Sequence, residues 1–191
     1  MSCASFASMK SSPLESDHPG ILVVGLGNPI LGDDGIGWRV AEAVESALSE
    51  ENPAGQDVEV ACFALGGLSL MEHLVGFDQA IIIDAVQTSA GTPGQVYDLS
   101  LADLPDLSAG HLTAAHDTSL QTALKLGQEM GAALPGDIRV VGIEADKVYD
   151  FSEILSPAVE AAIPEATQLV LNLVNELQGQ RSDLIAADSP A

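Results

Sequence analysis

Short apolar runs that alternate with amphipathic segments are the feature that most constrains how this chain can fold. ILVVGL at 21–26 and QAIIIDAV at 79–86 are almost continuously apolar, and DVEVACFAL at 57–65 becomes so after an alternating start. Such runs are typical of strands covered on both faces of a sheet. DIRVVGIE at 137–144 predicts another central strand, and GQVYDLS at 94–100 predicts a shorter strand at a sheet edge.

Helical periodicity fills the intervals between these predicted strands. Over 34–50, apolar residues recur every fourth position, which predicts a helix with one buried face. Further helices are expected over 69–76, 117–130 and 156–177, and Pro164 should kink or restart the last one. Strands separated by helices predict an α/β fold, with an open, mostly parallel sheet and helices on both of its faces.

The length and the polar ends indicate how the chain is organised. Its 191 residues, 47% of them hydrophobic, suit one domain with a sizeable core. Polar, small residues fill 1–19 and 178–191, which predicts a disordered N-terminal extension and a flexible C-terminal tail around a domain at 20–177. The irregular segment 101–115 is too long for an ordinary connection and is a candidate functional loop.

A strong excess of acidic residues restricts the partners. Twenty-eight Asp and Glu against six Lys and Arg give a formal charge of -22, which repels nucleic acid and anionic lipid. Cations and basic protein surfaces are the favoured partners, although a merely well-solvated surface would look the same. Residues 1–19 resemble no secretory signal and no apolar run is long enough to span a membrane, so a cytoplasmic protein is expected.

The glycine-rich stretch GLGNPILGDDGIG at 25–37 poses the question of dinucleotide binding. The fingerprint G-x-G-x-x-G lacks its third glycine here, because Ile30 occupies that position. Asp33 and Asp34 stand at the start of the following helix, where they would repel a pyrophosphate. The predicted strand at 57–65 ends without a carboxylate for a ribose, and no G-K-S or G-K-T marks a P-loop. Phosphate binding is therefore not expected.

Carboxylates and one histidine follow the predicted strands instead. Asp33 and Asp34 come after the first strand, Asp84 ends the run AIIID, and His116 precedes a predicted helix. Ligands of open α/β sheets collect at the carboxyl ends of the strands, so these side chains are plausible neighbours. Each also has an ordinary explanation, as a helix cap, a turn residue or a helix-start residue.

Two carboxylates and one imidazole would suit a divalent first-row ion such as zinc or nickel and would leave coordination positions open. An ion so held can polarise a carbonyl or activate a water molecule. A Ser-His-Asp hydrolase is the competing enzyme, but no G-x-S-x-G elbow is present.

Four segments occur in an order and at a spacing that point to one family: ILVVGLGNPILGDDGIGWRVAEAV at 21–44, GFDQAIIIDAV at 76–86, HDTSLQTALKLG at 116–127 and VVGIEADKVYDFSEILSPAVEAAI at 140–163. Together they resemble the hydrogenase maturation proteases, the endopeptidases that trim the carboxyl terminus of [NiFe]-hydrogenase large-subunit precursors. The resemblance covers about 20–177 and implies a single three-layer αβα domain with a twisted, mostly parallel sheet of about five strands.

The resemblance also implies a site and a substrate. The family's metal-contacting and catalytic positions fall on Asp34, Asp84 and His116, and Asp33 takes a supporting role, capping the helix or holding the turn. The metal is nickel, supplied by the precursor and shared with the protease, so that cleavage checks that the metal has been inserted. A monomer is expected, with no nucleic acid and no membrane as partner.

One departure bears on the substrate. Many relatives carry D-G-G-T-x-G after the second strand, whereas this chain has LGGLSLMEHL, which keeps only Gly66 and Gly67. This variant resembles the proteases of cytoplasmic bidirectional hydrogenases. The alternatives are a nickel-sensing chaperone of the same fold that does not cut, and a general metal-binding α/β protein.

Overall fold

The computed structural model of the protein describes residues 20–51, 57–101, 120–146, 148 and 151–187. The elements of the described chain are, in order, β1 (Ile21–Leu26), the 3₁₀ turn η1 (Gly32–Gly35), α1 (Ile36–Glu51), β2 (Val58–Phe63), α2 (Gly67–Leu74), β3 (Gln79–Val86), β4 (Val96–Ser100), α3 (Leu120–Glu129), β5 (Asp137–Glu144), α4 (Pro157–Ala161) and α5 (Ile163–Ala187).

The strands form one sheet in the order β2-β1-β3-β5-β4, with β4 antiparallel to β5 and the other pairs parallel. This confirms the predicted α/β class with a mostly parallel sheet of five strands. β1, β3 and β5 have the predicted bounds, and they are the three inner strands. The predicted strands 57–65 and 94–100 are shorter than expected and form the two edges. Edge strands have one neighbour each, so their ends are less strongly held in the sheet.

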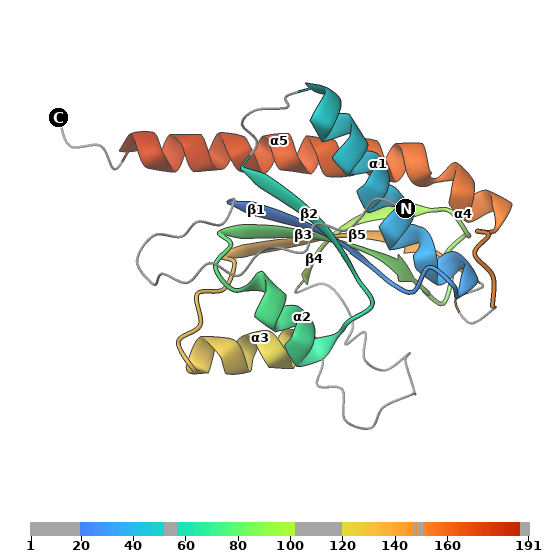
Figure 1. Ribbon diagram of the computed structural model, residues 1–191, viewed down its shortest axis with the longest axis horizontal. Coiled ribbons are helices and arrows are strands. Elements are labelled where there is room, and N and C mark those ends of the chain that lie inside the picture. Colours follow the sequence, from blue (N-terminus) through green and yellow to red (C-terminus); the bar gives the residue numbers. More distant parts are fainter. Residues whose placement is uncertain (1–19, 52–56, 102–119, 147, 149–150, 188–191) are drawn as a thin grey trace.

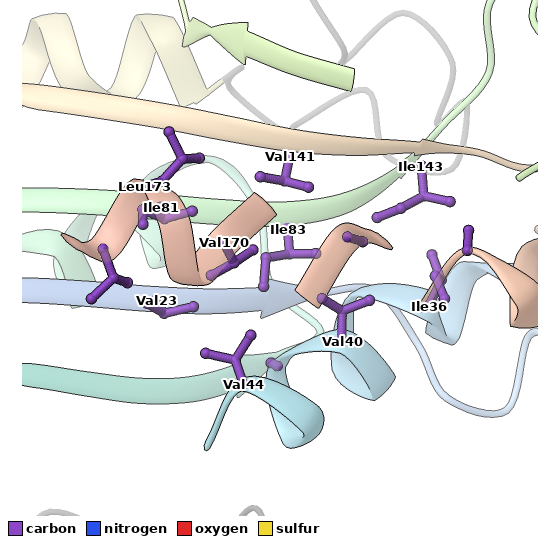
Figure 2. Packing of buried hydrophobic residues seen from close by; sticks show 14 of the residues in the cluster. Val23, Ile36, Val40, Val44, Ile81, Ile83, Val141, Ile143, Val170 and Leu173 are labelled. Atoms are coloured by element: carbon purple, nitrogen blue, oxygen red, sulfur yellow. The ribbon is translucent and has the colours of Figure 1, made fainter. Parts of the chain in front are cut away.

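Helices cover both faces of the sheet, which gives the predicted three layers (Figure 1). Alternate residues of the inner strands point to opposite faces. Val23, Ile81 and Val141 belong to a buried cluster with α1 and α5, shown in Figure 2, whereas Leu22 and Ile82 belong to a second cluster with α2 and α3. A core on each face explains why these strands are apolar at nearly every position.

The last two helices match the prediction at one end and correct it at the other. α4 ends at Ala161 and α5 begins at Ile163, so the helix does restart, with Pro164 as the second residue of α5. The tail predicted at 178–191 is wrong as far as Ala187, because α5 continues to that residue. The residues after Gly179 include the good helix formers Gln, Arg, Leu and Ala, so the helix continues past this glycine. The predicted N-terminal extension at 1–19 and the last residues, 188–191, lie outside the described residues. The candidate loop 101–115 also lies outside them, except for Leu101.

Glycines let α1 pack directly against the ends of β1 and β3. A Cβ added to Gly37 would meet the carbonyl oxygens of Leu26 and Ile83, and one added to Gly25 would lie 2.8 Å from the Cβ of Ala41. Gly27 has φ +116°, a conformation that L side chains rarely adopt. In dinucleotide-binding turns the third glycine allows close packing of helix on strand. Gly37 plays that part here, further along a longer turn.

Replacing Gly37 by alanine should destabilise the protein by on the order of 1–3 kcal/mol, because the new methyl group meets rigid backbone oxygens. Gly179→Ala is the matched control: it is also helical, a Cβ there meets nothing within 4 Å, and it should stabilise by roughly 0.5–1 kcal/mol. Urea unfolding of both variants measures the two effects. Two changes of the same sign would contradict the packing described for Gly37.

Candidate functional site

Three segments that follow parallel strands meet at one edge of the sheet. They are the turn 27–35 after β1, the end of β3 around Asp84, and the described residues 145, 146, 148 and 151–156 after β5. Because β1, β3 and β5 are neighbours and parallel, their carboxyl ends lie side by side.

Asp33 ties the first of these segments to the third. Its side chain is 0% exposed, and its Oδ1 accepts a hydrogen bond from the backbone N–H of Ser156, 2.6 Å away, just before α4. Ser152 strengthens the link, since its N–H donates to the carbonyl of Ile30 and its own carbonyl accepts from Gly32. Asp33 thus has the supporting role that was expected, and one of its partners is a residue 123 positions away.

Asp34 stands on the same turn and is half-buried. Its Oδ2 accepts a hydrogen bond of 2.6 Å from the N–H of Asn28. A Cβ on Gly27 would collide with the carbonyl oxygen of Asp34, so only glycine fits beside it. The turn therefore holds this carboxylate in a defined orientation.

Asp84 lies in β3, opposite Gly142 of β5. Although the residue as a whole is half-buried, its carboxyl group is enclosed, and its pKa is raised from 3.8 to about 7. Burial is the largest cause of this rise, the negative charge of Asp34 adds to it, and a hydrogen bond from the backbone of Ala85 opposes it. A carboxylate on the turn after β1 and one in the neighbouring strand β3 thus act on each other. A proton or a cation between them would relieve the repulsion.

The third predicted ligand, His116, lies outside the described residues. Among the residues that the structure does describe, no group of three or more His, Cys, Asp or Glu side chains could hold a metal ion. The structure therefore brings Asp34 and Asp84 within electrostatic reach of each other, and the set of three stays a prediction.

Glu144 is a buried carboxylate that the sequence reasoning missed. It ends β5, is 3% exposed, and accepts hydrogen bonds from the N–H of Thr88 at 2.7 Å, the hydroxyl of Thr88 at 3.0 Å and that of Tyr97 at 3.0 Å. A Cβ on Gly91 would overlap this carboxylate. Glu144 thereby fastens the connection between β3 and β4 beside Asp84. The signal was available, because Glu144, like Asp84, is an acidic residue that follows an apolar strand.

The fold and this edge define an α/β protein whose Rossmann-like turn presents carboxylates, where a nucleotide-binding protein would present free backbone N–H groups to phosphate. The model of the hydrogenase maturation protease family matches residues 38–173. The chain belongs to this family, as the resemblance predicted.

Similar proteins agree with that assignment. The hydrogenase 2 maturation protease of Escherichia coli is 29% identical over 156 residues, which cover 82% of this chain and 91% of that protein. The hydrogenase expression/formation protein HoxM of Azotobacter vinelandii is 27% identical over 158 residues, 83% of this chain and 73% of its own. The structure of the hydrogenase maturating endopeptidase HybD from E. coli superposes with a TM-score of 0.61 at 26% identity, covering 82% of this chain and 92% of that one.

The protein is accordingly a hydrolase, an endopeptidase of a family that acts on hydrogenase large-subunit precursors. None of the helices in the described part of the chain has the length and apolar character needed to cross a membrane.

The buried bond of Asp33 should be visible in the stability of the protein. Asp33→Ala removes the acceptor of the Ser156 N–H and should lower the free energy of unfolding by about 1–3 kcal/mol. Asp33→Asn keeps an oxygen at that position and should lose less. Urea unfolding of both variants measures the change. If Asp33→Ala lowered the free energy of unfolding by less than about 0.5 kcal/mol, as substitution of an ordinary surface residue does, the prediction would be wrong.

Asp84 should make the stability of the free protein depend on pH. The unfolded chain ionises this carboxyl near pH 3.8, whereas the folded protein does so at about 7, so stability falls as the pH rises between these values. Asp84→Asn cannot ionise, and its stability relative to wild type should grow over that range by roughly 2–4 kcal/mol. Unfolding at pH 4 to 8 in the presence of a chelator measures this. A constant difference between the two proteins would contradict the raised pKa.

Proposed function

We propose that this protease removes a C-terminal peptide from the nickel-loaded precursor of a [NiFe]-hydrogenase large subunit, and that Asp34, Asp84 and His116 contact the nickel of that substrate. The observation that carries the proposal is the carboxylate pair. Asp34 lies on the turn after β1 and Asp84 near the end of the neighbouring strand β3, and the charge of Asp34 raises the pKa of Asp84.

The donor set suits a metal that arrives with its own ligands. Two carboxylates and one imidazole leave positions open on a first-row divalent ion, so the ion can be shared with the precursor. Bound there, nickel would act as a Lewis acid on the scissile carbonyl or on a water molecule. Asp84 would lose its proton as the cation arrives, because the positive charge reverses the effect of Asp34. Two hydrogen bonds would keep Asp34 in position for this contact. The N–H of Asn28 donates to Asp34 itself, and the N–H of Ser156 donates to the neighbouring Asp33.

A cytoplasmic bidirectional hydrogenase is the proposed source of the precursor, and the protease is proposed to act in the cytoplasm as a monomer. The support is the segment at Gly66 and Gly67, which departs from the commoner family motif. A Cβ on Gly66 would meet nothing within 4 Å, so the backbone there is open to an approaching peptide. The protease domain itself is proposed to span 20–177, after an extension at 1–19.

Substitutions that keep the shape of the site should abolish cleavage. Asp34→Asn and Asp84→Asn should each cut the nickel-loaded precursor at least about 100-fold more slowly than wild type, because an amide is a poorer metal ligand than a carboxylate. Asp98→Asn, an equal change in a residue of the edge strand β4 that pairs with Arg139 of β5, should cut at the wild-type rate. Loss of the terminal peptide, followed by mass spectrometry, is the measurement.

His116→Ala and the nickel-free precursor complete this test. Both should prevent cleavage by an otherwise folded enzyme. Unimpaired cutting by Asp84→Asn would refute the site, and equal cutting of the nickel-free precursor would refute the role of nickel. Stable complex formation by wild type without any cleavage would favour the chaperone alternative.

A further inference from the structure

Exposed apolar side chains gather at the edge of the sheet that carries the carboxylates. Eight large hydrophobic residues of the described chain are exposed. Five of them lie in segments that follow β1, β2 or β5, namely Ile30, Leu65, Leu68, Phe151 and Ile154. The chain has a formal charge of -22, so exposed apolar side chains that collect at one edge of the sheet mark a candidate binding surface. A partner that contacts this edge alone could cover all five.

Three of the five form one feature, which we name the apolar rim: Ile30, Phe151 and Ile154, exposed by 47%, 88% and 78%. A parallel bridge pairs Leu31 with Ser152, which places Ile30 next to Phe151 in register. The N–H of Ser152 donates to the carbonyl of Ile30 at 3.1 Å, and the Ser152 hydroxyl accepts from the N–H of Ile154 at 3.0 Å. The rim therefore joins the turn after β1 to the segment after β5.

The rim is held in place although its side chains contribute little to the core. The buried bond from Asp33 to Ser156 and the bridge at Ser152 both fix the segment that carries Phe151 and Ile154. A phenylalanine with 88% of its surface in water gains almost nothing from folding, and would gain by being covered on binding. Preformed apolar anchors of this kind commonly supply most of the binding energy at an interface.

The position of the rim indicates what covers it. Ile30 is four residues from Asp34 in the same turn, so the rim lies near the carboxylate pair, within reach of a large partner that binds there. Glu153, between Phe151 and Ile154 in the chain, is exposed, and so is Glu160 on the helix α4 that follows, which makes this part of the surface acidic. A fitting partner has an apolar segment flanked by basic side chains.

We propose that the apolar rim is the surface on which the hydrogenase large-subunit precursor docks, through an apolar segment flanked by basic residues. The inference rests on the proposed function, because the same precursor has to reach Asp34 and Asp84. It adds that Ile30, Phe151 and Ile154 contribute to affinity for the precursor and take no part in the chemistry.

The test compares two exposed apolar sites on the same protein. Replacing Phe151 and Ile154 together by serine should lower kcat/KM for the nickel-loaded precursor roughly tenfold or more, through KM, with kcat at saturation unchanged. Met130→Ser is the matched control and should behave as wild type. Met130 is 77% exposed but follows α3 near the start of β3, at the opposite edge, where Gly136 donates to the carbonyl of Asp78. Unchanged thermal unfolding should confirm that both variants are folded.

The outcomes separate the rim from the catalytic site. An unchanged KM in the double variant, with Asp84→Asn inactive, would overturn the rim and leave the proposed function standing. If Asp84→Asn cut normally, the proposed site would fail while a raised KM in the double variant would still support the rim. If wild type cut no precursor, titration calorimetry would decide, and equal binding by wild type and the double variant would overturn the proposal. A wild-type dimer that the double variant converts to monomer would show that the rim binds a second copy, and would also overturn it.

Discussion

A buried carboxylate with a distant backbone partner holds the site together. Asp33 has no exposed surface, and a buried charge is tolerated only when its oxygens accept hydrogen bonds. The N–H of Ser156 provides one of these, at 2.6 Å. Because Ser156 directly precedes α4, this bond connects the turn after β1 to the segment that leads into α4 and α5. The orientation of Asp34 and the placing of the apolar rim both follow from that connection.

The same turn shows how one backbone design serves opposite charges. A strand, a glycine-rich turn and a helix packed closely against the sheet are also the parts of a phosphate-binding site. Gly25, Gly27 and Gly37 preserve that close packing here. Asp33 and Asp34, however, place negative charge where phosphate would lie, next to a helix start that favours anions. The helix stabilises the protein's own carboxylates, and these in turn favour a cation as ligand.

Electrostatics then couples the two halves of the site. Burial and the charge of Asp34 raise the pKa of Asp84 to about 7, so that near neutral pH a fraction of the free protein carries a proton at the proposed metal site. Such a site binds a cation at the cost of releasing that proton. Glu144, on the next strand β5, has a structural role instead. Its carboxylate accepts three hydrogen bonds, two from Thr88 and one from Tyr97.

The sequence by itself determined the α/β class, the inner strands β1, β3 and β5, the buried face of α1 and the family, because these depend on local periodicity and on motifs read along the chain. It also indicated that Asp34 and Asp84 are neighbours, since parallel strands end at one edge. Only the tertiary structure decided that Asp33 bonds to Ser156, that Glu144 fastens the segment beside Asp84, that α5 continues to Ala187, and that Ile30 adjoins Phe151. The bonds and the apolar rim join residues far apart in the sequence, and no local pattern reports which distant partner a buried or exposed side chain will meet.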